Sequence, residues 1–299
     1  TIMLRITSSA NRRLSFIIIA GVAGALFASF SSEDFLSAPY PPLILVPEGE
    51  FVYGSSREER EIAKALDSNN AAKTNTKNFS AYDSEPARKI IYLDNFLIMS
   101  TPVTIEQYAA FIEDTDHPVP QLKNTGSNGH LSEHTSSGIV NYSWNNNISP
   151  QDRGNHPVVM VSWSDAVSYA SWLSIKTGRN FRLPTSKEWE KAARGINGAY
   201  FPWGMSYDPN LLNSGDSGLN ETTPVGQYPK GASSFGLLDA AGQVFEWTNT
   251  NSGKNKYIIK GGSWKSYGCG VCRPAAQRAE NKETRNIITG FRLVDIGKH

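Results

Sequence analysis

Cysteine is scarce in this chain of 299 residues, and the two copies, Cys269 and Cys272, stand in a single C-x-x-C unit. Two cysteines three positions apart exclude the network of disulfides that holds many small secreted domains together. A local disulfide, a metal clip and a thiol exchange pair are the alternatives that remain. Outside the cytoplasm a plain disulfide is the most economical of the three.

An excess of charge of either sign is lacking as well. The chain has 29 Lys and Arg against 28 Asp and Glu, which gives a formal net charge of +1. Such a chain has no basic field to attract nucleic acid, so we expect no nucleic-acid partner. No internal repeat is visible, and the 25 Gly, 16 Pro and 11% aromatic residues are typical of a turn-rich globular domain with an aromatic core.

A long apolar run occurs once, near the N-terminus. Residues 14–30 carry no charge and follow Arg5, Arg12 and Arg13. The run is typical of a short membrane-spanning helix and equally of a secretory signal peptide, and we favour a retained anchor. Basic residues before the run keep the N-terminus in the cytoplasm and place the main domain in the periplasm or another extracytoplasmic space. Small residues in the run permit close helix packing, so the expected partners are membrane lipid and membrane-protein subunits.

The chain divides into three segments. Residues 1–30 form the cytoplasmic stub and anchor, residues 31–42 form a proline-rich linker, and residues 43–299 form one folded domain. Apolar periodicity and capping residues predict helices at 57–66, at 104–112 after the cap Thr104, from the cap Ser164 to Gly178, and at 186–194 after the cap Thr185. Strands are expected at 43–46, 50–53, 90–99, 256–260 and 290–294. A few helices among short strands predict an α+β domain.

A series of short motifs runs through this domain in a fixed order. In the first half they are VPEGEFVYGS at 46–55, EP at 85–86, PVTIEQY at 102–108 and HPVVMVSWSDA at 156–166. In the second half they are FRLPTSKEWEKAARG at 181–195, FPWG at 201–204, TPVG at 223–226, FGLLDAAGQVFEW at 235–247, GGSW at 261–264 and GFRL at 290–293. Together they resemble the formylglycine-generating enzyme (sulfatase-modifying factor) family. The resemblance implies the C-type-lectin-like α+β fold of that family, with little regular secondary structure.

The resemblance also implies a structural calcium site in the segment 239–246. The side chains of Asp239 and Glu246 and the backbone carbonyls of Gly242 and Val244 would supply its oxygens. Calcium takes six to eight oxygen ligands, and two carboxylates around a glycine turn supply charge and curvature together.

A second calcium site of the family falls in a loop that is shortened in this chain. The resemblance places Asn213 and Ser214 among its ligands, and Asp216 is a further oxygen donor close by. Both sites would hold the ion for structural purposes.

Copper is the catalytic metal that the resemblance implies, and here the chain departs from the family. The oxidising members bind it through two cysteines separated by four residues, shortly after the GGS segment, and soft thiolates suit Cu(I). Cys272 is close to the second position, but the first falls at Ser266 or Tyr267, and Cys269 stands at the wrong distance.

Two other family positions differ as well. Phe245 replaces the tryptophan before the motif glutamate, and Ser186 replaces the glutamate expected after Thr185. Cys269, Cys272 and Ser263 of the GGS segment are the catalytic candidates that remain. An H-x-x-E-H pattern at 130–134 matches one group of zinc proteases, but its Gly-rich and Ser-rich flanks argue against the helix that such a site needs.

Two functions are compatible with these observations. In the first, the chain is a non-catalytic or divergent family member whose calcium-bound domain is a docking surface and an accessory subunit of a membrane assembly. In the second, it is an oxidase of the formylglycine-generating or pyoverdine-maturation type. One fold can host both enzymes and binding modules, so the family alone does not decide between the two functions. The cysteine spacing favours the first function, because the copper-binding spacing of the oxidising members is absent.

Overall fold

The computed structural model describes residues 40–68, 79–122, 141–145 and 147–297. The predicted anchor at 14–30 and the H-x-x-E-H pattern at 130–134 lie outside these residues. Within the described part, no helix is long and apolar enough to cross a membrane.

Four α-helices and several single-turn helices alternate with short strands. The α-helices are α1 (Arg57–Ser68), α2 (Ile105–Thr115), α4 (Trp163–Thr177) and α5 (Ser186–Arg194) in the described residues. The 3-10 helices are η1 (Phe79–Ser84), η3 (Pro209–Leu211), η4 (Gly215–Ser217), η5 (Pro229–Gly231) and η6 (Gly270–Cys272). The strands are β1 (Leu43–Val46), β2 (Gly49–Tyr53), β3 (Lys89–Leu93), β4 (Phe96–Met99), β5 (Phe181–Arg182), β6 (Phe245–Asn251), β7 (Lys256–Lys260), β8 (Arg278–Asn281), β9 (Thr289–Gly290) and β10 (Val294–Asp295). The predicted α+β class is therefore confirmed.

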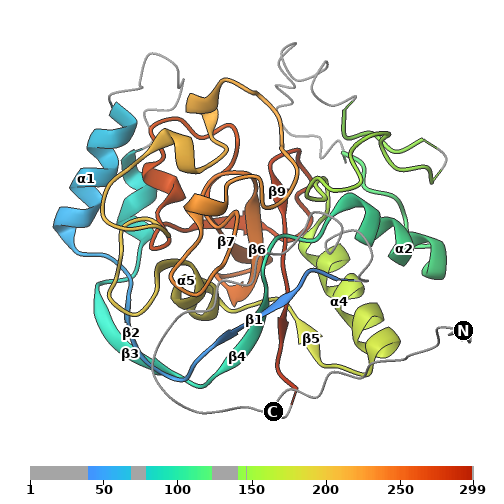
Figure 1. Ribbon diagram of the computed structural model, residues 1–299, viewed down its shortest axis with the longest axis horizontal. Coiled ribbons are helices and arrows are strands. Elements are labelled where there is room, and N and C mark those ends of the chain that lie inside the picture. Colours follow the sequence, from blue (N-terminus) through green and yellow to red (C-terminus); the bar gives the residue numbers. More distant parts are fainter. Residues whose placement is uncertain (1–39, 69–78, 123–140, 146, 298–299) are drawn as a thin grey trace, which may run out of the picture.

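The strands form small sheets rather than one continuous sheet. Two of them have four strands, in the orders β1-β4-β10-β5 and β8-β7-β6-β9, and β2 pairs with β3 alone. In Figure 1 the sheet that contains β6 and β7 lies at the centre, with α1 on one side and α2 and α4 on the other. The last strand, β10, lies between β4 and β5, so the two ends of the domain share one sheet.

Three of the helices begin with a capping box. Thr104, Ser162 and Thr185 each accept a hydrogen bond from the backbone N–H three residues on, and the side chain at that position bonds back to the cap. The predictions for Thr104 and Thr185 are confirmed. The prediction for Ser164 is wrong, because α4 begins one residue before Ser164 and Asp165 completes the box with Ser162.

The main core lies between α2, α4 and the end of the chain. Tyr108 of α2 stacks on Tyr169 of α4 with ring centroids 5.6 Å apart, and Phe291 meets the Tyr169 ring edge-on at 5.4 Å. All three side chains are buried. The apolar stripe of α4 is thus core, and it positions the segment that follows β9.

The predicted strands at 43–46, 50–53 and 256–260 are confirmed as β1, β2 and β7, and the prediction is wrong where a bend interrupts a strand. Residues 90–99 form two strands, β3 and β4, and the segment 290–294 is shared between β9 and β10. Strand β6 was not predicted, and it begins inside the motif segment at 235–247. The motif carboxylate Glu246 therefore lies on a central strand and not in a loop.

Candidate functional site

Three loops that carry the motifs meet at one place. The backbone N–H of Gly242 donates to Gly261 O (2.7 Å), and the N–H of Trp264 donates to Gln243 O (3.0 Å). The N–H of Gln243 in turn donates to Asn213 O (2.7 Å). These hydrogen bonds join the segments 239–246, 261–264 and 213–217.

Cys269 and Cys272 form a disulfide, with their Cα atoms 4.8 Å apart. Both sulfurs are buried, in an apolar cluster that includes Leu212 and Ala241. The GGS loop lies directly against them: a Cβ on Gly262, whose φ is +74°, would stand 2.6 Å from Cys272 Sγ. Of the alternatives left open by the sequence, the structure has the local disulfide.

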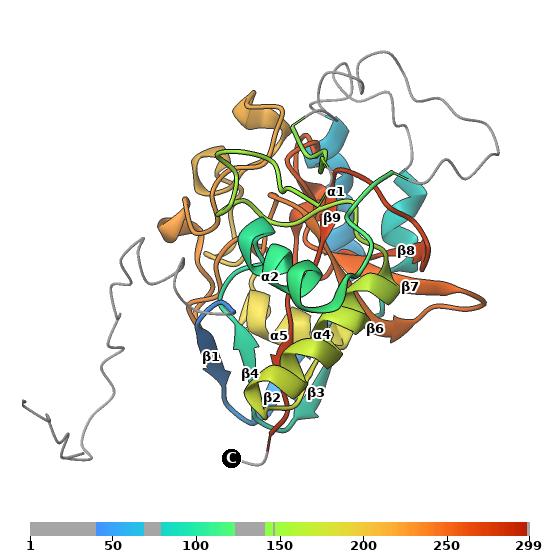
Figure 2. The same cartoon turned by 90° about the vertical axis from the view of Figure 1, so that its right-hand side faces the viewer.

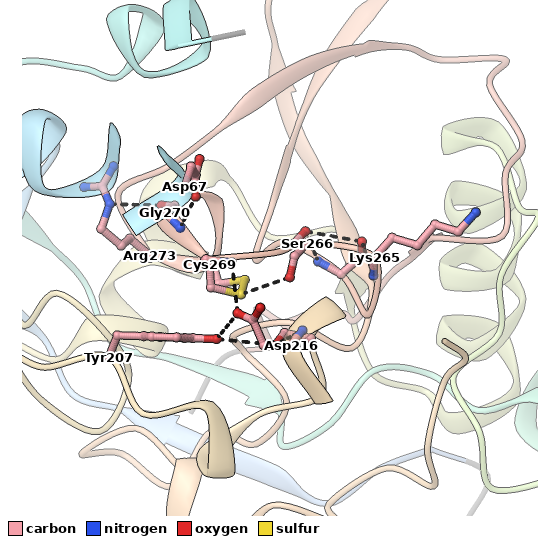
Figure 3. Close-up of a disulfide and its surroundings, with 12 residues drawn as sticks. Asp67, Tyr207, Asp216, Lys265, Ser266, Cys269, Gly270 and Arg273 are labelled. Carbon is pink, nitrogen blue, oxygen red and sulfur yellow. Dashed lines mark hydrogen bonds between the residues drawn. A yellow bond between two sulfur atoms is a disulfide. The ribbon is translucent and has the colours of Figure 1, made fainter. Parts of the chain in front are cut away.

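Two carboxylate and tyrosine pairs hold the disulfide loop from opposite sides, as Figure 3 shows in part. Asp216 accepts hydrogen bonds from the backbone N–H of Gly268 (2.9 Å) and from the Tyr207 hydroxyl (2.7 Å). Asp67, at the end of α1, accepts from the N–H of Gly270 (2.8 Å) and from a tyrosine hydroxyl, that of Tyr82. Burial raises the pKa of the Asp67 carboxyl.

Arg273, a residue of the disulfide loop itself, adds further contacts to those made by Asp67 and Asp216. Its Nε donates to Gly270 O at 3.0 Å, and its Nη2 forms a fully buried ion pair with Glu85 at 2.6 Å. Glycine is required at position 270 because a Cβ there would stand 2.5 Å from Ala63 O of α1. The loop is therefore fixed to α1 by close backbone approach as well as by hydrogen bonds.

Ser266 is one of the two residues, with Tyr267, at which the resemblance puts the first copper cysteine. Its hydroxyl accepts from the N–H of Ser263 (3.0 Å), and the Ser263 hydroxyl accepts from the N–H of Lys265 (3.3 Å). Both hydroxyls thus stabilise a tight turn. One position has a hydroxyl and the two sulfurs are bonded to each other, so the residues present do not fit a copper ion held by two thiolates.

Glu246 is the partner of a buried arginine. Arg292 donates from Nε and Nη2 to the two carboxylate oxygens, each at 2.7 Å, and the indole N–H of Trp189 donates to Glu246 Oε2 at 2.8 Å. All three side chains are fully buried. A bidentate arginine thus balances the Glu246 charge, and the role of Glu246 as a calcium ligand stays a prediction.

Asp239, in contrast to Glu246, has no direct ion pair among the described residues. It is buried and accepts a hydrogen bond from the N–H of Gly226 (2.7 Å). Burial, with a smaller contribution from the nearby Glu246 charge, raises the pKa of Asp239 to about 6. The Arg292 charge is close enough to lower the pKa of Asp239, although its direct ion pair is with Glu246. A buried carboxylate that no cation pairs with directly favours a bound cation, and this is compatible with the predicted role of Asp239 as a calcium ligand.

The turn around Gly242 brings two loops into close contact. A Cβ on Gly242, whose φ is +72°, would stand 2.1 Å from Asn213 O, so the two loops approach more closely than a side chain allows. The ligand roles of the Gly242 and Val244 carbonyls stay predictions.

The loop of the second predicted calcium site is held by its own hydrogen bonds. The Asn213 amide donates to Gln243 Oε1 (3.0 Å), and its Oδ1 accepts from the Ser217 hydroxyl (3.2 Å). The Ser214 hydroxyl accepts from the N–H of Asp216 (3.3 Å). These polar groups close the turn of η4, and Asp216 points to the disulfide loop. In the described part of the chain no three His, Cys, Asp or Glu residues form a group suited to a metal ion.

Sequence reasoning missed the residues that neutralise and clamp this site. Arg292 lies in the recognised GFRL motif, but nothing local to it shows that it pairs with Glu246, 46 residues away. Asp67 belongs to a polar stretch with no motif, and it reaches Gly270 across 203 residues. Both contacts depend on tertiary structure alone.

The fold and the convergent loops define a domain of the formylglycine-generating enzyme type. The family described as "Sulfatase-modifying factor enzyme 1-like domain" matches residues 31–296. The chain belongs to this family.

Its relatives include enzymes and a protein named as inactive. The formylglycine-generating enzyme of Mycobacterium tuberculosis is 36% identical over 183 residues, which is 48% of this chain and 58% of the relative. The hercynine oxygenase of Mycolicibacterium smegmatis is 28% identical over 247 residues, 71% of this chain and 55% of the relative. The "Inactive C-alpha-formylglycine-generating enzyme 2" of Mus musculus is 37% identical over 122 residues, 36% of this chain and 37% of the relative. The matches thus span between 37% and 58% of these relatives' length.

Among solved structures, PvdO from Pseudomonas aeruginosa superimposes with a TM-score of 0.65 and 21% sequence identity, over 86% of this chain and 95% of that one. This likeness shows the fold that the resemblance implied. The function has to be argued from the residues of this chain.

Proposed function

We propose that the chain is a membrane-anchored, extracytoplasmic member of its family that has lost copper-dependent oxidation and serves as a docking or accessory subunit of a membrane assembly. The apolar run at 14–30 behind Arg12 and Arg13 supports the anchor. The relative that is named as inactive is a precedent for a family member without the reaction.

The observation that carries the proposal is the state of the cysteine loop. Cys272, close to the second copper position of the family, is bonded to Cys269 in a disulfide, and the first position has the hydroxyl of Ser266 or Tyr267 in place of a thiolate. The clamp by Asp67 and Asp216 and the close contact with Gly262 make this loop part of the packed interior. A loop held in this way stabilises a rigid surface and has no free sulfur for oxygen chemistry.

The test combines a thiol titration with a copper competition and an activity assay. The full chain, purified in mild detergent and denatured without reductant, should show no free thiol. The native chain should not compete for Cu(I) with a chelating dye, and should leave a cysteine-containing sulfatase peptide unchanged in mass. Stoichiometric Cu(I) binding by native protein that Cys272→Ser abolishes, together with peptide oxidation, would establish the oxidase instead.

A calcium ion at Asp239 belongs to the same proposal. The ion would balance the buried Asp239 charge and join the segment 239–246 to the rest of the domain, with Glu246 left to Arg292. It would supply structural rigidity and take no part in chemistry.

The alternative function is an oxidase without the paired copper cysteines. It is favoured by the match to the hercynine oxygenase, which extends over 71% of this chain. Peptide or small-molecule oxidation by purified protein that persists in Cys269→Ser and Cys272→Ser would support it. Oxidation that is lost in both variants would show that the reaction depends on the cysteines. The absence of oxidation by the wild type would support the docking role.

A further inference from the structure

Several large apolar side chains of the domain are exposed. Ile90 and Tyr92 of β3 are 66% and 56% exposed, Leu45 of β1 is 54% exposed, and Ile296 after β10 is 41% exposed. Ile175, in the last turn of α4, is 86% exposed. These positions account for most of the exposed large hydrophobic residues in the described part of the chain.

The elements that carry them lie along the same side. In Figures 1 and 2, which differ by a turn about the vertical axis, β1, β3, β4, the end of α4 and the C-terminus all lie in the lower half. We call this side the lower face. A shallow cavity of about 340 Å³ lies between the β3–β4 turn and the segment after β10. Leu93 and Phe96 of the turn and Ile296 of that segment line it.

The chain enters the domain beside β5, a strand of the sheet that also contains β1 and β4. Tyr40, the first described residue, packs against Phe181 of β5 with ring centroids 5.1 Å apart. Ten positions separate Tyr40 from Phe30, the last residue of the apolar run. Ten extended residues span at most about 35 Å, so an anchor in the bilayer keeps the lower face close to the membrane.

Charge on the lower face is mixed and largely paired. Lys176 forms an ion pair with Asp114, and Arg179 forms one with Asp295. Lys89 is exposed beside Ile90, whereas Tyr92 lies near acidic side chains, those of Glu48 and Asp94. Such a surface has no strong preference for anionic lipid, and contact would depend on its apolar side chains and on an interfacial tyrosine.

We propose that the lower face rests on the lipid surface, with Tyr92, Ile175 and Ile296 in contact with the headgroup region. This inference rests on the proposed membrane anchor and adds the orientation of the domain to it. The opposite side, which carries η3 and η4, then faces away from the membrane and is the surface open to a partner.

Site-specific fluorescence on the full chain in vesicles tests the orientation. A single cysteine is introduced as Tyr92→Cys, Ile175→Cys or Ile296→Cys and labelled with an environment-sensitive dye; the native cysteines are closed in their disulfide. Leu219→Cys, 48% exposed just after η4, is the matched control. Vesicles of phosphatidylcholine, with or without nitroxide headgroup lipid, provide the quencher.

We expect at least twofold quenching at the three lower-face positions and none at position 219, with the same result after 20% anionic lipid is added. Flotation of the unlabelled chain with vesicles at alkaline pH tests the anchor separately. A chain that does not float would overturn the proposed anchor. A chain that floats with all four labels unquenched would overturn the orientation alone.

A further arm separates lipid from protein as the occupant of the lower face. Labels that are shielded in native membranes but not in pure lipid vesicles would show that a protein covers this face, against the proposal. The double variant Tyr92→Ser with Ile175→Ser should keep the melting temperature, because both side chains are exposed, and should reduce quenching at position 296.

Discussion

Asp239 and Glu246 belong to one motif and have different surroundings. The Glu246 charge is balanced by Arg292 and by the Trp189 indole, whereas Asp239 has a backbone N–H and no ion pair among the described residues. The pKa of Asp239 rises to about 6 for this reason, chiefly through burial. A carboxylate of this kind destabilises the fold when it is ionised and alone, and stabilises it when a cation is bound.

The first prediction follows from the sign of that shift. Because the pKa is raised in the folded state, the metal-free protein is most stable below pH 4 with respect to this group and loses stability as the pH rises through about 6. At pH 7.5 the loss is about 3 kcal/mol for a shift of this size. In excess chelator, Asp239→Asn should therefore be more stable than the wild type at pH 7.5, measured by urea unfolding.

Calcium should reverse this order. The wild type should gain in melting temperature when calcium is added, and Asp239→Asn should not. A wild type that is indifferent to calcium and to chelator would remove the site.

A second prediction concerns Gly262, which packs on the disulfide. Gly262→Ala should destabilise the protein in two ways, by about 1 kcal/mol for a non-glycine residue at positive φ and by about 1 to 3 kcal/mol for the overlap with Cys272. Gly178 is the matched control, since its φ of +70° is close to +74° and nothing lies within 4 Å of its added Cβ. Equal losses for Gly178→Ala and Gly262→Ala would show that Gly262 does not contact the disulfide as described.

At the scale of elements, the helices were predictable because their signals are local. Capping boxes and a terminal glycine specify a start and an end within a few residues, and α2 and α5 begin where these signals place them. The start of α4 was misassigned because Ser162 and Ser164 are both cap residues. The choice was made by Asp165, which accepts bonds from the Ser162 N–H and hydroxyl, each at 2.7 Å.

This assignment gives the third prediction. Ser162→Ala should cost about 1 kcal/mol of stability through the loss of the N-cap. Ser164→Ala, at the second residue of α4, should change stability by a few tenths of a kcal/mol at most. Chemical denaturation of the two variants side by side is the measurement, and the reverse ranking would contradict the cap.

Strand β6 was missed for a physical reason. It pairs with β7 and, in parallel, with β9, so its position depends on partners that follow it in the chain. In the sequence its first residues, from Phe245 on, follow directly after the turn at Gly242 and have no separate strand pattern. Edge and bend positions elsewhere, such as the break between β3 and β4, likewise depend on the sheet and not on the segment.

For the whole molecule, the fourth prediction is association in the membrane. The full chain in mild detergent should elute as a complex with at least one other membrane protein, seen by light scattering and mass spectrometry. A chain in which residues 1–30 are replaced by a cleavable secretion signal is the control and should elute alone. A full chain that also elutes alone would contradict the accessory role and favour a free-standing enzyme.

By itself the sequence determined the family, the α+β class, most helix limits and the departure from the copper pattern, because each of these depends on residue identity and short spacing. The tertiary structure decided which charges meet. Glu246 pairs with Arg292, Asp67 and Asp216 hold the disulfide loop, and Asp239 is buried without an ion pair. These contacts join residues far apart in the chain, and their energies come from burial and proximity, which no local pattern records.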